Sequence, residues 1–411
     1  MFDLDDYSVS FALDCATISK SICEGANEED YATVANVISN KCSLLVPKTE
    51  HLSASARVEA FKSFRFGWKE VAKIVFKVFV HKVFRLVWYF ERKQLKRNPP
   101  SKVFKAWVEV NVDSWGEEYS SRNSCVLILP FPLKLSRQLT FMRRLWEGDV
   151  KSSLYGYAYS LKSLLRYIIR RDVESLARLE NSAAESYAQD ILGLGVAEVF
   201  HMDDVEVQSY VANSLLRREG VLVRFRNHGI GRYSPFFTAS SAVFFNESQR
   251  DYYEALNSFR GVELLYSFDR FLAYEKSDLR QVIFVSQLIN GMPAEYEGLE
   301  QRVLKKLSVL SKELGFSLAV KLHPNGRDAE FLKAYPCVNF LESSTNCSTI
   351  FFTNYSTSYY TFEQYGPTYL IRSAEVDPSI FFGNEERIVN ETTFSDSASF
   401  IEAISNKVVL F

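Results

Sequence analysis

The chain has 411 residues, 47% of them hydrophobic and 15% aromatic, and its formal net charge is −2. This length predicts two domains of roughly 150 to 250 residues, the composition excludes a disordered chain, and the charge excludes a global field that would recruit nucleic acid. The six cysteines form no CxxC pair and the acidic N-terminus lacks a signal-peptide pattern, so we expect a cytoplasmic protein with reduced thiols and no zinc site. No charge-free apolar run is long enough to span a membrane.

The first half of the chain alternates between short apolar runs and helical patterns. The predicted strands cover residues 8–13, 42–46, 106–112, 126–131, 197–201, 221–225, 242–245 and 262–266. The predicted helices cover about 29–39, 69–97, 137–146, 152–170, 173–191, 205–218 and 247–257. A polar segment at 269–280 then predicts a linker between domains.

The second half repeats the alternation. Its predicted strands cover residues 282–287, 316–322, 338–341, 349–352 and 368–371, with helices at 296–314 and 327–334 and a third after a turn at 356–358. This order is typical of parallel, doubly wound sheets. We therefore predict an α/β protein with two Rossmann-like domains, 1–270 and 280–411, that face a cleft, and with extra helices inserted in the first half.

The predicted helix at 69–97 is long, basic and amphipathic. The stretch Phe61–Arg97 holds 11 Lys or Arg and two Glu. Basic residues recur every three to five positions, with aliphatic and aromatic residues between them: Lys69, Lys73, Lys77, Lys82 and Arg85. Such a helix either lies on an anionic membrane surface or packs its wide apolar face against the domain and leaves a solvated basic stripe.

His323 stands where the predicted strand 316–322 ends, and Pro324 prevents the strand from continuing. Open parallel sheets bind ligands at the carboxyl ends of their strands. His323 is therefore a candidate binding residue. The alternative is a loop histidine that is hydrogen-bonded to the backbone.

A turn rich in hydroxyl groups follows the strand at 349–352. Ser356, Thr357 and Ser358 lie at a predicted helix start, where free N–H groups and the helix dipole favour an anion. Simple N-capping is the alternative, and it needs only one of the three. Gln287 ends the first strand of this half and would meet this turn and His323, which predicts a nucleotide-phosphate site. The sequence has neither a Walker lysine nor GxGxxG after a strand, which excludes P-loop and dinucleotide sites.

The first half offers candidate reacting groups. His228 follows the strand at 221–225 and would serve as a general base near neutral pH. Asp203 and Asp204 follow the preceding strand, and either would orient the histidine or act as the base. The alternative is that these residues only form a turn and a helix cap. A metal site is disfavoured because no tight ligand spacing occurs.

The motifs of the second half resemble those of a known group of enzymes. Lys-Leu-His-Pro at 321–324 with Thr-Asn-Tyr-Ser-Thr-Ser-Tyr-Tyr at 353–360 is similar to bacterial sialyltransferases, polysialyltransferases and related Kdo transferases of the GT-B fold. The resemblance implies that His323 and Ser356, Thr357 or Ser358 contact the phosphate of a CMP-sugar. Lys321 and Thr353, in the same two motifs, are further candidate binding residues. The resemblance also implies that the CMP-sugar is a co-substrate and that no metal or other cofactor is required.

The polysialyltransferases take their base from an acidic-acidic-Gly motif, whereas residues 227–229 here read Asn-His-Gly. Either His228 has taken the role, or an acid such as Asp203 or Asp204 carries it. The resemblance covers mainly residues 280–375.

These observations predict a glycosyltransferase that moves a 2-keto acid sugar, such as sialic acid or Kdo, from CMP to a bacterial surface glycan or a lipid-linked acceptor. We expect it in the cytoplasm, with the basic helix as a peripheral contact to the inner face of the membrane. Three alternatives stay open: a cytidine-dependent polyol-phosphate transferase of the teichoic-acid type, a GT-B nucleotide-sugar epimerase, and a non-catalytic scaffold in polysaccharide assembly. The missing acidic-acidic-Gly motif best supports the scaffold.

Overall fold

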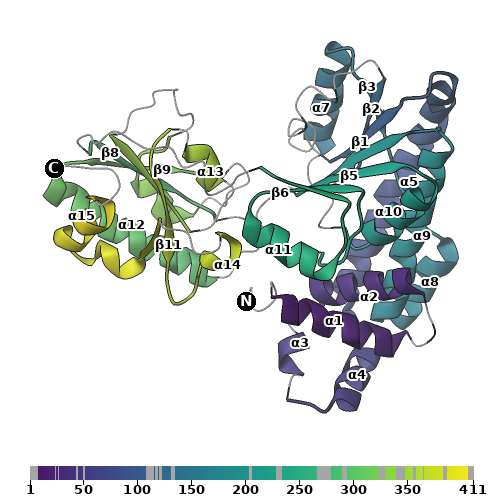
Figure 1. Ribbon diagram of the computed structural model, residues 1–411, viewed down its shortest axis with the longest axis horizontal. Helices are drawn as coiled ribbons and strands as arrows, with labels where there is room; N and C mark the ends of the chain where they lie inside the picture. The colour runs from purple at the N-terminus through teal and green to yellow at the C-terminus, as the bar shows by residue number, and fades with distance from the viewer. Residues whose placement is uncertain are drawn as a thin grey trace.

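The computed structural model describes residues 8–23, 25, 27–42, 45–49, 51–107, 115, 119, 123–130, 135–202, 206–227, 234–265, 279–288, 294–323, 329–338, 348–354, 358–363, 365–382 and 387–405. These residues form two lobes, each built around one parallel sheet (Figure 1). The N-terminal lobe runs from purple to green in the figure, and the C-terminal lobe from green to yellow.

The N-terminal lobe holds a seven-stranded sheet in the order β3-β2-β1-β4-β5-β6-β7, and every pair in it is parallel. The strands are β1 (Lys102–Ala106), β2 (Ser124–Ile128), β3 (Lys151–Leu154), β4 (Glu198–His201), β5 (Leu222–Arg226), β6 (Ser241–Phe244) and β7 (Gly261–Leu264). The chain adds β2 and β3 on one side of β1 and then returns to add β4 on the other. The strand order therefore reverses between β1 and β4.

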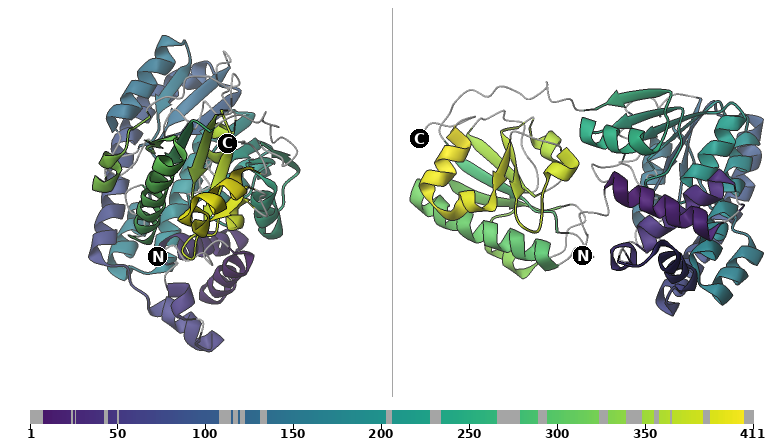
Figure 2. Two further views of the ribbon diagram at one scale, coloured as in Figure 1. Left: turned by 90° about the vertical axis from the view of Figure 1, so that its left-hand side faces the viewer. Right: turned by 60° about the horizontal axis from the view of Figure 1, so that its bottom comes forward.

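Helices surround this sheet, and five of them precede its first strand (Figure 2). They are α1 (Val9–Ile22), α2 (Glu28–Lys41), α3 (Leu45–Lys48), α4 (Ala54–Ser63) and α5 (Trp68–Arg97). The later helices are α7 (Leu135–Glu147), α8 (Leu161–Arg170), α9 (Val173–Leu192), α10 (Ser209–Arg218) and α11 (Glu247–Leu256). The extra helices thus stand before the sheet in the sequence.

The C-terminal lobe holds a five-stranded parallel sheet in the order β12-β11-β10-β8-β9. The strands are β8 (Gln281–Val285), β9 (Ser317–Lys321), β10 (Thr349–Thr353), β11 (Thr368–Arg372) and β12 (Ile388–Asn390). The helices are α12 (Ala294–Leu314), the 3₁₀ helix η5 (Glu330–Ala334), α13 (Ser358–Phe362), α14 (Ser379–Phe382), η6 (Glu391–Ser395) and α15 (Ser397–Ser405). Two Rossmann-like sheets in tandem confirm the predicted α/β, GT-B-like fold class.

A buried hydrogen bond joins the two lobes. Asn246, which follows β6 and caps α11, donates from Nδ2 to the hydroxyl of Tyr360 on α13 at 2.9 Å. Figure 1 shows α11 beside α14 at the same boundary. Asn246 lies two residues beyond the carboxyl end of β6, and α13 follows the carboxyl end of β10. The contact therefore brings the carboxyl edges of the two sheets to the boundary between the lobes.

The predicted strand at 8–13 is wrong, because these residues begin α1. Val9, Phe11 and Leu13 alternate with small residues, which is the pattern of a strand. Over a longer stretch, however, Phe11, Cys15 and Ile18 are buried at helical spacing, and these residues form a helix. The Ser8 hydroxyl caps the helix by accepting from the Phe11 N–H at 2.9 Å. The strand predicted at 42–46 is also wrong where it is described, since α3 begins at Leu45.

Other boundaries moved for physical reasons. The helix predicted at 152–170 is the strand β3 followed by α8, and Gly156 lies between them directly against the backbone of α5. A Cβ added at Gly156 would lie 2.0 Å from the carbonyl oxygen of His81. The strand predicted at 106–112 is misplaced, because β1 covers Lys102–Ala106 and ends at the residue where the prediction begins. Residues 108–112, the strand end at 339–341 and most of the linker at 269–280 lie outside the described residues.

Candidate functional site

The C-terminal sheet reverses its strand order at β8 and β10. From β8 the chain passes through α12 to β9 on one side, and then crosses to β10 on the other. Open parallel sheets bind ligands at the carboxyl ends of the two strands where such a reversal occurs. Val285 at the end of β8 pairs with Thr353 of β10 and with Lys321 of β9. The three strand ends that carry the predicted donor-binding residues are therefore adjacent.

A buried glutamate holds the chain immediately after β8. Glu300 on α12 accepts from the Ser286 hydroxyl at 2.6 Å and from the Gln287 backbone N–H at 2.8 Å. Gln287 itself is buried, and its Nε2 donates to the Ser286 carbonyl at 3.1 Å. Burial raises the pKa of Glu300 to about 7, against the two hydrogen bonds, which lower it. Glu300 fixes the loop in which the sequence predicted Gln287 as a binding residue.

Asn354 is a buried polar side chain at the carboxyl edge of the C-terminal sheet that has no hydrogen-bond partner within the described part of the chain. It follows Thr353, whose hydroxyl donates to the Val285 carbonyl at 3.2 Å and so fastens β10 to β8. Asn354 is 0% exposed, and neither its Oδ1 nor its Nδ2 has a hydrogen-bond partner among the described residues. Burying a carboxamide without partners costs on the order of 1–3 kcal/mol per group. Such a side chain at a strand-order reversal is a candidate ligand contact.

Lys321 and His323 lie on the neighbouring strand end. The Lys321 carbonyl accepts from the Ser286 N–H at 3.0 Å, which ties β9 to the loop after β8. Lys321 and His323 are both partly exposed. Ser356 and Thr357 lie outside the described residues, whereas Ser358 is the first residue of α13. The strand and the helix predicted on either side of this turn are thus present as β10 and α13, while the roles of these residues stay predictions.

In the N-terminal lobe the predicted reacting groups Asp203, Asp204 and His228 lie outside the described residues. Their flanks are described. Asn227 follows β5 and is 0% exposed, and both polar atoms of its carboxamide are without partners among the described residues. Its backbone N–H donates to the Val243 carbonyl at 3.2 Å, which ties it to β6. Asn227 therefore repeats in this lobe the arrangement of Asn354 in the other.

A buried ion pair near the carboxyl end of β1 escaped the sequence analysis. Lys105 on β1 donates to the carboxylate of Glu206, which also accepts from the Tyr157 hydroxyl at 2.9 Å. Burial lowers the pKa of Lys105 although Glu206 raises it. Glu206 comes two residues after the predicted Asp204, so the acidic loop after β4 holds at least one carboxylate that is engaged structurally. A lysine within an apolar strand (KVFKA) was the available signal.

Helix α5 has one face buried in the lobe and another that is exposed, while a contact with a membrane stays a prediction. Val71, Val78, Phe84 and Trp88 are buried against the lobe. A separate stripe of large apolar side chains is exposed: Trp68, Val75, Phe76, Phe79, Val83, Leu86, Tyr89 and Phe90, the last at 73%. An exposed apolar stripe of this length marks an interaction surface.

The basic residues of α5 divide in the same way. Lys77 pairs with the buried Glu180 on α9 at 2.9 Å. Burial by itself would lower the pKa of Lys77, but Glu180 raises it above its ordinary value. Arg85 and Arg92 both pair with the buried Asp190. Two of the five residues of the predicted basic stripe, Lys77 and Arg85, are therefore structural, while Lys69, Lys73 and Lys82 are exposed on the helix.

No cluster of three or more His, Cys, Asp or Glu that would hold a metal ion occurs in the part of the chain that the structure describes. No helix within the described ranges combines the length and the apolar character needed to cross a membrane.

No protein-family model matches the sequence, and no curated protein matches it. Among solved structures, UDP-N-acetylglucosamine 2-epimerase from Rickettsia bellii aligns with a TM-score of 0.42 and 11% identity over 75% of this chain and 88% of that chain. Acinetobacter baumannii MurG gives 0.40 and 11% over 75% and 94%. CalG4, the calicheamicin glycosyltransferase, gives 0.40 and 10% over 75% and 89%. At these TM-scores the likeness says nothing of what this chain binds or acts on.

Proposed function

We propose that the chain is a glycosyltransferase that binds a nucleotide-sugar at the carboxyl edge of the C-terminal sheet and an acceptor at the carboxyl edge of the N-terminal sheet. One observation carries the proposal: the unpartnered, fully buried carboxamide of Asn354 lies at the strand-order reversal, beside the loop that Glu300 fixes. Ligands bind at such reversals in open parallel sheets.

The finer proposal is that the donor is a CMP-activated 2-keto acid sugar. It rests on the motif resemblance at 321–324 and 353–360, to which the adjacency of β9, β8 and β10 adds support. In the reaction, an acceptor hydroxyl oxygen bonds to the anomeric carbon of the sugar, and the bond from that carbon to the phosphate oxygen breaks. The electron pair of the broken bond leaves with CMP, and donors at His323 and the start of α13 stabilise its phosphate.

The hydroxyl proton goes to a base in the N-terminal lobe, for which His228, Asp203 and Asp204 remain the candidates. The buried contact between Asn246 and Tyr360 supports a base in one lobe and a phosphate site in the other, because it brings the carboxyl edges of the two sheets to one boundary. Proton acceptor and leaving group would then approach the same sugar from different lobes.

We further propose that the exposed stripe of α5 rests on an anionic membrane surface where lipid-linked acceptors reside. Aromatic residues in the interface and lysines beside them suit such a surface. Replacing Phe79, Leu86 and Phe90 together with serine should abolish sedimentation with liposomes that contain phosphatidylglycerol. Val309→Ser, at an exposed apolar position of α12, is the control that should leave sedimentation unchanged. Equal sedimentation of both variants would contradict this role.

The donor proposal is tested by nucleotide binding. We expect CMP to raise the melting temperature more than UMP, UDP, GMP or AMP at equal concentration, because a ligand stabilises the native state it binds. If UDP stabilises the protein instead, the site is a nucleotide site and the CMP assignment is wrong. If none of the nucleotides has an effect, the glycosyltransferase proposal itself loses its support.

Asn354→Leu gives a sharper test because it separates stability from binding. The free protein should be as stable as the wild type or more stable, since the variant removes an unsatisfied buried carboxamide. Nucleotide binding should nevertheless fall by about tenfold or more, the value of one lost hydrogen bond to a charged group. Asn227→Leu is the matched control: it removes the corresponding group of the other lobe and should leave nucleotide affinity unchanged. A destabilised Asn354→Leu protein with normal affinity would make Asn354 structural.

A further inference from the structure

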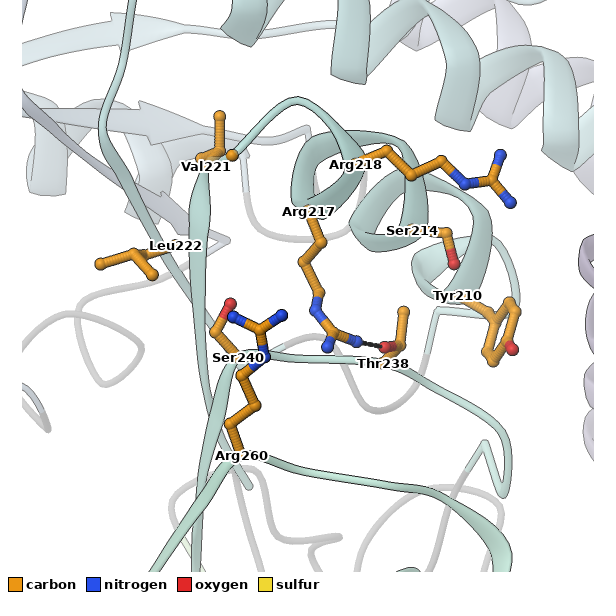
Figure 3. Close-up of a pocket in the computed structure, with 10 residues that line it drawn as sticks. Tyr210, Ser214, Arg217, Arg218, Val221, Leu222, Thr238, Ser240 and Arg260 are labelled. Carbon is orange, nitrogen blue, oxygen red and sulfur yellow. Dashed lines mark hydrogen bonds between the residues drawn. The ribbon is translucent and has the colours of Figure 1, made fainter.

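A cavity of about 370 Å³ lies at the opposite edge of the N-terminal sheet from the proposed acceptor site. It is formed where β5, β6 and β7 begin and where α10 ends (Figure 3). Its lining includes Arg217 and Arg218 from α10 and Arg260 from the residue before β7. No Asp or Glu is among the described residues that line it. Arg217 and Arg260 therefore give the cavity a positive charge that no lining carboxylate among the described residues offsets.

Two of these arginines lack a counter-charge. Arg217 donates to the hydroxyl of Thr238. Figure 3 shows the guanidinium of Arg260 beside Ser240, on the side that faces Arg217. Neither Arg217 nor Arg260 forms an ion pair with any described residue. Burial, and then the nearby charge of Arg260, lower the pKa of Arg217. Arg218 differs, because it pairs with Glu29.

The hydroxyl groups of the pocket are arranged to donate. The Thr238 oxygen accepts from Arg217, and the Ser240 oxygen accepts from the Val223 backbone N–H at 3.1 Å. Both hydroxyls therefore keep their own hydrogen to give to a ligand. Two guanidinium forks and two hydroxyl donors, with no acceptor group opposing them, match the oxygens of a tetrahedral dianion.

A second cavity adjoins the first. It measures about 720 Å³ and shares Arg217, Thr238 and Tyr210 with the basic pocket. Its other walls are mixed: Leu13, Phe236 and Leu256 are apolar, whereas Lys20, Glu28 and Glu254 are charged. An anion held by Arg217 and Arg260 would therefore have room for an organic portion on the side of α1 and α2.

We propose that this pocket binds a phosphate group, at a site separate from the carboxyl edges of the two sheets. The proposal does not depend on the glycosyltransferase proposal, because none of its residues lies at a carboxyl strand end. A phosphate group bound here would neutralise the charges of Arg217 and Arg260 and join α10 to the starts of β6 and β7.

The test is calorimetric titration with inorganic phosphate at constant ionic strength, with chloride as the balancing salt. We expect saturable binding that Arg260→Gln weakens about tenfold or more, since it removes charge-assisted hydrogen bonds. Arg260 is exposed, so this variant should fold as the wild type, and its melting curve in chloride checks that. Arg143→Gln removes the same charge from an exposed position on α7 and should leave phosphate binding intact.

Titration with glycerol phosphate then separates two sources of the group. Tighter binding than that of inorganic phosphate, lost equally in Arg260→Gln, assigns the adjoining cavity to the organic portion of a phosphomonoester. Weaker binding assigns the pocket to free phosphate. Absence of saturable phosphate binding, or equal affinity in Arg260→Gln and the wild type, would overturn the proposal.

Discussion

The burial of Glu300 in the C-terminal lobe makes a quantitative prediction about stability and pH, because its carboxyl group has no cationic partner among the described residues. Glu300 lies on the apolar face of α12 beside Leu299 and Val303, and it is 1% exposed. Burial raises its pKa from the ordinary 4.5 to about 7. In the unfolded chain the same group titrates at its ordinary value. The folded state therefore holds a proton on Glu300 that the unfolded state has released between these two pH values.

The sign and size of the effect follow from linkage. Because the pKa is raised on folding, the contribution of Glu300 is most favourable below about pH 4.5 and is lost as the pH rises toward 7. At 1.36 kcal/mol per pKa unit, the full loss is about 3 kcal/mol, of which about 2 to 3 kcal/mol falls between pH 5 and pH 8. Glu300→Gln keeps an oxygen for the Gln287 N–H and cannot ionise. The free energy of unfolding of the variant, relative to that of the wild type, should therefore rise by about 2 to 3 kcal/mol between pH 5 and pH 8.

Urea unfolding followed by far-ultraviolet circular dichroism at the two pH values measures the difference. All five tryptophans, Trp68, Trp88, Trp107, Trp115 and Trp146, precede the C-terminal sheet. Their fluorescence thus reports the N-terminal lobe in the same samples. Glu402→Gln, at an exposed position of α15, controls for the change of charge. The reasoning is refuted if the difference between Glu300→Gln and the wild type is the same at pH 5 and pH 8.

Three further predictions follow from single contacts. Gly156→Ala should destabilise the N-terminal lobe by about 3 kcal/mol or more, because the new Cβ would meet the backbone of α5 at 2.0 Å; Gly67→Ala, with nothing within 4 Å, should change the melting temperature little. His323→Ala should cut turnover about 10- to 1,000-fold with an unchanged unfolding midpoint, and unchanged kinetics would remove this residue from the site. Glu180→Leu should cost about 1 to 3 kcal/mol in urea unfolding, because it leaves the half-buried Lys77 ammonium without its partner, and an unchanged free energy of unfolding would contradict that role of the pairing.

Elements with a strong period were predictable from the sequence. Helix α12 shows why: Tyr296, Leu299, Val303, Leu304 and Leu307 recur at spacings of three and four and are all buried. The alternation of strands and helices was sufficient for the two parallel sheets as well. Strand order cannot be read from one sequence, so the reversal at β8 and β10 became visible only in the structure.

The errors arose where local patterns compete with tertiary contacts. The apolar alternation at Val9, Phe11 and Leu13 fits a strand over six residues, whereas the helix that forms there is decided by burial over fourteen. The segment around Gly156 read as helix because nothing local reveals that α5 lies against it. Glu300 was missed for a related reason: an acid on an apolar helix face was a visible signal, but its partners at Ser286 and Gln287 are brought to it only by folding.

The site residues predicted from the sequence are mainly histidines, acids and hydroxyl groups, and in both lobes an asparagine close to them was overlooked. His228 follows Asn227, and the hydroxyl-rich turn follows Asn354. Each asparagine comes directly after a strand, is fully buried, and has a carboxamide without partners among the described residues. Four unsatisfied polar atoms at about 1–3 kcal/mol each are a large cost against a typical stability of about 5–15 kcal/mol.

The stability of the fold does not explain the two asparagines, since an apolar side chain of similar shape would avoid this cost. The cost would be absent in a ligand-bound state in which both carboxamides have hydrogen-bond partners. Both lie at carboxyl strand ends, and β6, which holds the Asn227 backbone, continues into Asn246 at the boundary with the other lobe. A nucleotide-sugar at one sheet and an acceptor at the other would each satisfy one of the two groups. That makes the pair a better guide to the bound state than any single titratable residue of the sequence.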